Sequence, residues 1–106
     1  MYHIHPVIDL ALCEGFQWDA GNARKSVDKH GVSQAEAEQV FFVEPLLLLP
    51  DIRHSETESH FYALGHTDDG RRLHLTFTLR DNGRLIRAIS VRDMHRTERT
   101  RYGQDT

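Results

Sequence analysis

The chain of 106 residues has little that would link it covalently or place it in a membrane. Its one cysteine, Cys13, cannot form a disulfide within the chain and offers no second thiol for a zinc site. No stretch approaches the roughly 20 apolar residues that a membrane-spanning helix needs. The first residues lack the basic segment that begins a signal peptide. These absences predict a soluble, cytoplasmic protein that does not act at a membrane.

Repeats and low-complexity segments are also missing, and what is present fits one small folded domain. The hydrophobic fraction is 39% and the charged fraction is 27%, with the charges spread along the chain. A chain of this length buries roughly two thirds of its extended surface on folding, which is enough for one core. We expect a single domain over residues 16–102, an N-terminal extension over 1–15 and a flexible tail over 103–106.

The net charge of −3 conceals a strong asymmetry between the two parts of the chain. Residues 1–70 contain 4 Lys and Arg but 12 Asp and Glu, whereas residues 71–106 contain 9 Arg, no Lys and 4 Asp and Glu. Arginine presents a planar fork that binds phosphate through two parallel hydrogen bonds. The C-terminal part therefore favours a polyanion as partner, and the alternative is the solvated face of a β-hairpin.

Two helices are predicted in the first half of the chain. Asp19 is placed to cap a helix over residues 20–30, and Gly31 is placed to end it in a left-handed conformation. The segment Ser33-Gln34-Ala35-Glu36 has the spacing of a capping box, so it predicts the start of a second helix. Pro45 prevents that helix from continuing.

Strands are predicted over residues 16–18, 46–49, 61–66, 71–80 and 85–92. In 71–80, leucines and a phenylalanine alternate with polar residues, which is typical of a strand with one face on the core. Asp81-Asn82-Gly83 predicts a tight turn, and the apolar residues of 85–92 predict a strand buried on both faces. With a short helix over 97–102, the expected class is α+β: N-terminal helices packed on a twisted antiparallel sheet with a short C-terminal helix.

A series of short segments follows one another in an order that one known family shares. The segments are Trp18-Asp19, Lys29-His30-Gly31-Val32, Glu36-Ala37, Val40-Phe41-Phe42, Asp51, His54-Ser55, Glu58, Tyr62-Ala63-Leu64-Gly65, Gly70-Arg71, Phe77-Thr78, Arg80, Ile89-Ser90, Arg92-Asp93-Met94, Glu98-Arg99 and Tyr102. From about Phe16 to Tyr102 the chain therefore resembles the BrnT family, the toxins of type II toxin–antitoxin pairs.

The resemblance implies a RelE-like fold and a ribonuclease that arrests growth and is neutralised by a BrnA-like antitoxin protein. In such pairs the antitoxin supplies the DNA binding, so this chain would contact DNA only through its partner, as a dimer or as a heterotetramer with the antitoxin. Three positions depart from the family pattern: Ser26 stands where asparagine is frequent, His60 where arginine is common and Val91 where alanine is usual. Loss of an arginine at position 60 would weaken a phosphate contact, unless His60 acts there as a proton donor.

Cleavage of RNA without a metal ion needs a base, an acid and cations that stabilise the charged phosphorane. His54, Glu58 and His60 lie within seven positions, and histidine ordinarily titrates near neutral pH. We assign His54 or Glu58 as base or acid and expect Arg80 and Arg92 to clamp the phosphate, giving a 2′,3′-cyclic product. Residues expected to bind the rest of the RNA are Lys29, His60, Arg71 and Arg99.

Each assignment has a structural alternative. His54 and Glu58 would also serve as a loop cap or a surface pair, and Arg80 as a charge at a hairpin end. Lys29 suits the C-terminus of a helix, and Arg87, in an apolar strand, favours a structural ion pair. Despite eight histidines, no His-Glu-x-x-His segment occurs and the acidic and histidine residues over 51–60 match no standard ligand spacing, so we expect neither a metal site nor a cofactor.

Two functions remain open at this level. The first is the RNA-cleaving toxin, and the second is a catalytically decayed relative that acts only as an antitoxin-binding, regulatory module, as the departures at Ser26 and His60 suggest. Stand-alone DNA binding is disfavoured because no helix-turn-helix spacing with a basic recognition helix occurs. Cleavage of RNA by the isolated protein separates the first two.

Overall fold

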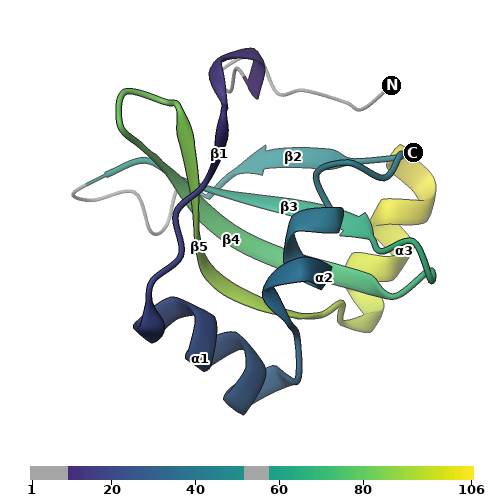
Figure 1. Cartoon of the computed structure of the whole chain (residues 1–106). Coiled ribbons are helices and arrows are strands. Elements are labelled where there is room, and N and C mark those ends of the chain that lie inside the picture. The colour runs from purple at the N-terminus through teal and green to yellow at the C-terminus, as the bar shows by residue number, and fades with distance from the viewer. Residues whose placement is uncertain (1–9, 52–57) are drawn as a thin grey trace.

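A computed structural model describes residues 10–51 and 58–106, apart from the side chains of Lys25, Ser26, Asp28, Lys29 and Asp105. Its elements are a short 3-10 turn η1 (Leu10–Leu12), β1 (Gly15–Phe16), α1 (Ala20–His30), α2 (Gln34–Gln39), β2 (Leu47–Pro50), β3 (His60–His66), β4 (Arg72–Arg80), β5 (Leu85–Asp93) and α3 (Arg96–Asp105). The strands form one sheet in the order β1-β5-β4-β3-β2 (Figure 1). The predicted α+β class is confirmed: the four longer strands are antiparallel, and β1 adds a parallel edge beside β5.

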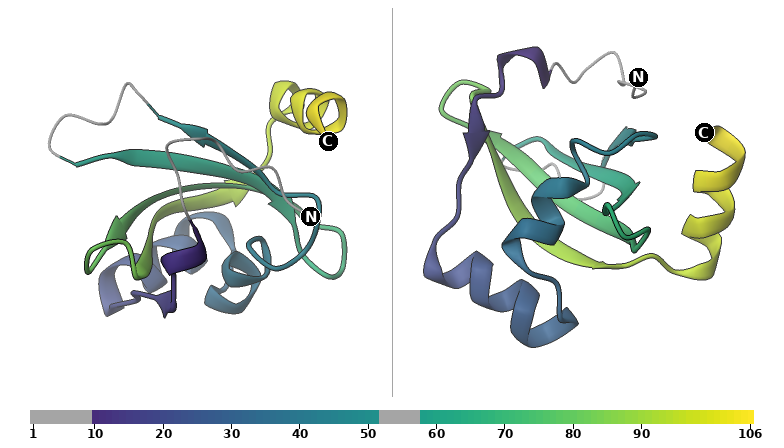
Figure 2. Two further views of the ribbon diagram at one scale, coloured as in Figure 1. Left: turned by 90° about the horizontal axis from the view of Figure 1, so that it is seen from above. Right: turned by 45° about the vertical axis from the view of Figure 1, so that its right-hand side comes forward.

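The sheet separates two layers of helix. α1 and α2 lie against one face, and α3 lies on the other face at one end of the sheet (Figure 2). The main core lies between the sheet and the first two helices. Its largest fully buried side chains include Val32, Val40, Leu73, Leu75 and Phe77. The helix-covered face is therefore closed by packing, and within the described part of the chain the opposite face is covered where α3 crosses it.

Local signals in the sequence explain why α1 and α2 begin where they do. The Asp19 carboxylate accepts a hydrogen bond from the Asn22 backbone (3.0 Å), and the Asn22 side chain accepts one from the Asp19 backbone (2.7 Å). The predicted capping box at α2 is confirmed, since both Ser33–Glu36 hydrogen bonds are present. Gly31 adopts the expected left-handed conformation, with φ of 65°.

The strand β4 alternates as predicted, but the prediction for β5 was wrong. In β5, Ile86, Ala88 and Val91 lie in the main core, while the remaining residues are at least partly exposed. The register shifts between Thr76 and Phe77 of β4, so that Ile89 is the extra residue of a β-bulge. A bulge changes the phase of the alternation, so the core residues Ala88 and Val91 are three positions apart instead of two.

Part of the predicted N-terminal extension is integrated into the domain. Leu10 and Cys13 pack against the main core, and the Cys13 thiol donates to the Gly83 carbonyl (3.3 Å). The backbone N–H of Glu14 donates to the Arg84 carbonyl (2.7 Å), which aligns β1 with β5. The rest of the predicted extension, residues 1–9, lies outside the described residues.

The C-terminal helix α3 is longer than the predicted 97–102 and enters the segment that was expected to be a tail. It begins at Arg96 because a capping box, in which the Glu98 carboxylate accepts from the His95 backbone (2.7 Å), fixes its first turn. Tyr102, with Met94 before the helix, packs on Leu47 of β2 in a second, smaller apolar cluster. Among the described residues, no helix has both the length and the apolar composition to cross a membrane.

Candidate active site

A pocket of about 780 Å³ lies on the sheet face that α1 and α2 leave uncovered. Its walls come from β3, β4, β5, the first turns of α3 and Asp51 after β2, and they combine aromatic, hydroxyl and charged side chains. They include His60, Tyr62, His74, Thr76, Ser90 and Arg92. The volume lies within the usual range of ligand pockets, roughly 300–1,000 Å³.

Strand register explains why these side chains gather. In the antiparallel pairing of β4 and β5, His74 lies opposite Arg92 and Thr76 lies opposite Ser90. Directly paired residues point to the same face of a sheet, with Cβ atoms about 5 Å apart. The alternation that sends the leucines of β4 into the core therefore places two hydroxyl groups, an imidazole and a guanidinium on the pocket side.

At one end of this pocket, Glu98 contacts both Arg92 and His74. Its carboxylate accepts two hydrogen bonds from the guanidinium of Arg92, at 2.7 and 2.8 Å, and lies 3.6 Å from Nε2 of His74. The hydrogen bonds from Arg92, followed by the one from the His95 backbone, lower the pKa of Glu98 to about 2. Since the same carboxylate caps α3, it joins the helix to the positively charged wall of the pocket.

Two aromatic rings lie in the pocket beside this ion pair. The rings of Tyr62 and His74 are stacked, with centroids 5.2 Å apart and planes inclined by 19°. Burial lowers the pKa of His74, and the nearby charge of Arg92 lowers it further. The imidazole is therefore neutral at neutral pH and stacks as an uncharged ring. The Tyr62 hydroxyl accepts a hydrogen bond from Arg101 (3.3 Å).

Three of the predicted site residues lie close together where β3 begins and β4 ends, away from Glu98 and Arg92. Arg80 Nη2 lies 3.0 Å from Glu58 Oε1, and His60 Nε2 lies 3.5 Å from the same oxygen. His60 also lines the pocket. The Nε atom of Arg80 is buried and has no hydrogen-bond partner among the described residues. His54, the other predicted proton-transfer residue, lies outside the described residues.

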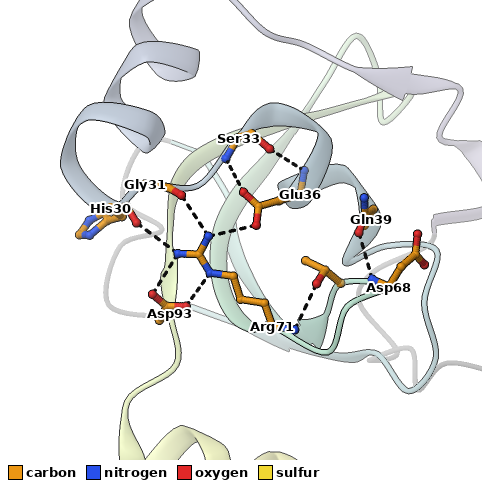
Figure 3. A network of polar contacts seen from close by, with 9 residues as sticks. His30, Gly31, Ser33, Glu36, Gln39, Asp68, Arg71 and Asp93 are labelled. Atoms are coloured by element: carbon orange, nitrogen blue, oxygen red, sulfur yellow. Dashed lines mark hydrogen bonds and ion pairs between the residues drawn. The ribbon is translucent and has the colours of Figure 1, made fainter.

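Arg71 lies elsewhere, at the junction of α1, α2 and the end of β5 (Figure 3). It makes one hydrogen bond for each of its five N–H donors: two to Asp93, one to Glu36, and one each to the backbone carbonyls of His30 and Gly31. The hydrogen bonds from Arg71 lower the pKa of Asp93. The pKa of Glu36 is lowered first by the hydrogen bond from the Ser33 backbone and then by the one from Arg71. Arg71 is not a wall residue of the pocket.

Of the two remaining predicted RNA contacts, one lies on the helix next to the pocket and the other on the helix layer that covers the opposite face of the sheet. Arg99 is exposed on α3, with Nη1 donating to the Met94 carbonyl (3.0 Å). Lys29 belongs to the last turn of α1, and its side chain is outside the described set. The structure thus brings together Glu58, His60 and Arg80, and separately Arg92, but not all eight predicted residues.

Sequence reasoning missed several wall residues as parts of the site. Glu98 was not assigned a role, although its position three residues after His95 matches the spacing of a capping box. Tyr62 and His74 were only weakly indicated by the sequence, as side chains on which an RNA base could stack. Among the residues that the structure describes, no three His, Cys, Asp or Glu side chains gather closely enough to hold a metal ion.

The fold and the pocket define a small α+β protein whose exposed sheet face combines imidazole and guanidinium groups with aromatic rings. Over residues 18–98 the chain matches the model of a family described as the ribonuclease toxin, BrnT, of type II toxin–antitoxin systems. Because this match covers most of the chain, the chain belongs to the BrnT family of ribonuclease toxins, which act on RNA and are paired with an antitoxin protein. A comparison with curated proteins gave no match.

Proposed function

We propose that this toxin cleaves RNA without a metal ion, in the pocket bounded by β3, β4, β5 and α3, and that cleavage arrests growth until a BrnA-like antitoxin neutralises the chain. The observation that carries the proposal is the gathering of Arg92, His60 and His74 in one pocket of ligand size. Membership in a ribonuclease toxin family supports the reaction class. The arginine-rich C-terminal part supplies the charge that a phosphate requires.

The chemistry needs no group beyond the side chains of the chain. A base takes the proton of the ribose 2′-OH, the 2′-oxygen attacks the adjacent phosphorus, and the 5′-oxygen leaves with a proton from an acid. The products are a 2′,3′-cyclic phosphate and a free 5′-hydroxyl. His54 or Glu58 serves as base or acid, and His60 is the alternative proton donor. Arg92 or Arg80 stabilises the charge that develops on the phosphorane, and the other binds an adjacent phosphate, because six residues of β4, roughly 20 Å, separate Arg80 from His74, the residue opposite Arg92.

The surroundings of the two arginines are compatible with this role. Arg92 is oriented by Glu98 before any substrate arrives, and orientation of a charged donor in advance is what lowers the cost of stabilising a transition state. Arg80 donates to the Glu58 carboxylate through Nη2 (3.0 Å), which orients its guanidinium. Glu58 lies between Arg80 and His60 and would hold both side chains in place.

The remaining predicted contacts divide into two groups. Arg99, exposed on α3, extends the RNA contacts outside the pocket, whereas Lys29 belongs to α1, on the opposite face of the sheet, and does not contact RNA bound in the pocket. Arg71 acts on the fold instead, because its five donors are already used within the protein. The assembly with the antitoxin, as a dimer or heterotetramer, and the indirect contact with DNA remain predictions of the resemblance.

The test is cleavage of a defined RNA by the purified chain, without its partner and in excess EDTA. We expect fragments ending in a 2′,3′-cyclic phosphate, and a loss of rate on the order of 100-fold for Arg92→Gln and for Arg80→Gln. Arg72→Gln, which removes an exposed arginine next to Arg71, is the matched control and should cut at the normal rate. A folded protein that leaves RNA intact, or cuts it only with added Mg²⁺, contradicts the proposal.

The ion pairs Arg80–Glu58 and Arg92–Glu98 favour a second candidate, a non-catalytic module that only binds its antitoxin. Both predicted clamp residues already have a carboxylate partner, which a phosphate would have to share. This function predicts tight binding to the product of the adjacent gene with no growth arrest when the chain is expressed alone. Expression with and without that reading frame separates the two candidates.

A further inference from the structure

The rings of Tyr62 and His74 stack on each other in the pocket, and the proton-transfer and phosphate-binding roles use neither ring. Both side chains line the pocket, and their planes are nearly parallel at a centroid distance of 5.2 Å. Tyr62 comes from β3 and His74 from β4, so the pair bridges two strands of a rigid sheet. Sites built on strands hold their side chains more accurately than sites built on loops.

Each ring is held at its polar edge by a charged neighbour. His74 Nε2 faces the Glu98 carboxylate at 3.6 Å, and the Tyr62 hydroxyl accepts from Arg101 Nη1 at 3.3 Å. The orientation of the pair therefore depends on α3, which contributes both neighbours. Tyr62 is half-buried, which leaves part of its ring exposed to the pocket. The pair is thus both fixed in place and accessible.

The groups around the pair match the parts of a nucleotide. Arg92, directly opposite His74 across the β4–β5 pairing, carries a positive charge suited to the phosphate. Thr76 and Ser90, paired one step further along the same strands, present hydroxyl groups to the pocket. Aromatic side chains on an open sheet face are a common stacking surface for unpaired RNA bases, and hydroxyl groups read base edges or riboses.

We propose that Tyr62, backed by His74, is the stacking platform for one unpaired nucleobase of the RNA, so that the pocket accepts single-stranded RNA and rejects the duplex. The inference rests on the proposed function in one respect, that RNA enters this pocket. A base held in a duplex has both faces covered by its neighbours and cannot stack on Tyr62. Tyr62 and His74 are therefore positioning residues, and they take no part in proton transfer.

The experiment uses a single-stranded oligonucleotide that is 2′-O-methylated at every position, so it cannot be cleaved, and that carries one 2-aminopurine. We expect its fluorescence to change on binding to the full chain, and its affinity to fall about tenfold or more for Tyr62→Leu. Tyr62→Phe, which keeps the ring and loses only the hydroxyl, should bind within about twofold of the original protein. For His74 we likewise expect the affinity to fall in His74→Leu and to be nearly unchanged in His74→Phe.

A measurement on the unaltered protein protects the test against variants that fail to fold. The complementary duplex of the same oligonucleotide should bind at least tenfold more weakly than the single strand. Equal affinity for the duplex, or full affinity in a folded Tyr62→Leu protein, overturns the platform even if RNA is cleaved normally. Failure of the proposed function gives a different result, since every form of the protein then lacks RNA cleavage in EDTA.

Discussion

The two faces of the sheet each hold an arginine that the sequence marks as a phosphate ligand, and the structure uses the two differently. On the helix side, Arg71 has a partner inside the protein for all five of its donors. On the open side, Arg92 makes three hydrogen bonds, two to Glu98 and one to the backbone carbonyl of Asp93. All donors of the Arg71 guanidinium are used in contacts that stabilise the fold, whereas the Arg92 guanidinium is oriented at the wall of the pocket.

The difference follows from what lies next to each side chain. The carbonyls of His30 and Gly31 lie at the C-terminal end of α1, where backbone acceptors lack helical partners. Arg71 satisfies them and adds two carboxylates, so it joins three elements (Figure 3). Arg92 lies beside one helix start, whose carboxylate orients it. An arginine near a helix C-terminus is thus a poor candidate for a ligand contact, whatever its place in a charge pattern.

The largest expected effect is on the helix side. Arg71→Ala removes five hydrogen bonds and leaves Glu36 and two carbonyls without their partner, so the free energy of unfolding should fall by about 3 kcal/mol. Urea unfolding followed by circular dichroism measures it. Arg72→Ala, an exposed neighbour, should change stability by less than about 0.5 kcal/mol. Equal effects of the two substitutions would show that Arg71 does not join the elements as described.

A second effect tests how tightly the covered face is packed. A Cβ added at Gly65 would lie 2.9 Å from Val40 Cγ1 and 3.2 Å from the Val40 carbonyl oxygen. Gly65→Ala should therefore cost about 2 kcal/mol of stability, measured as a lower Tm. The control is Gly103→Ala in α3, where an added Cβ meets nothing within 4 Å and helix propensity favours alanine. A neutral Gly65→Ala would argue that β3 and the end of α2 are not in close contact.

On the open side, Glu98→Gln should lower stability at neutral pH by about 1–2 kcal/mol, because Arg92 loses its ionic partner. The pKa of Glu98 is depressed to about 2 in the folded protein, from an ordinary value of 4.5. Its stabilising contribution is therefore complete above about pH 5 and is lost as the pH falls towards 2. The unaltered protein should lose stability over that window more steeply than Glu98→Gln, in unfolding curves recorded at several pH values. If the stability of the two proteins changed with pH in parallel, the ion pair between Glu98 and Arg92 would be contradicted.

The smallest effect concerns His74. Burial and Arg92 lower its pKa in the folded protein, so the unfolded chain binds a proton at higher pH than the folded chain does. The native state is therefore destabilised as the pH falls below the unfolded value of 6.5. His74→Phe, which keeps a stacking ring, should flatten the stability profile just below that pH. An unchanged slope would place the imidazole in contact with solvent.

The parts of the fold that could be predicted depend on residues close in sequence. Asp19, Gly31 and the Ser33–Glu36 pair mark helix ends by local hydrogen bonds, and the alternation in β4 marks a one-sided strand. Arg87, expected in a structural ion pair, does pair with Asp19 at 2.9 Å. The bulge at Ile89 could not be predicted, because it is a property of the pairing between β4 and β5.

The same distinction applies to the site. Glu58, His60 and Arg80 lie together because β3 and β4 are neighbours in a simple hairpin. Arg92, which was expected to clamp the same phosphate as Arg80, lies opposite His74 near the other end of β4. The contact of Tyr62 with His74, and of both with α3, depends on strand register and on where the last helix crosses the sheet. Neither is encoded in a local pattern.

The most direct test of the account is to map where RNA binds. Titration of the ¹⁵N-labelled chain with a non-cleavable, 2′-O-methylated single strand should shift amide resonances along β3, β4 and β5 on the pocket side, with Tyr62, His74, Ser90 and Arg92 among the strongest. The amides of α1 and α2, around Arg71, should stay in place. Shifts concentrated on those helices, with the pocket strands unaffected, would contradict the assignment of the open face as the RNA site.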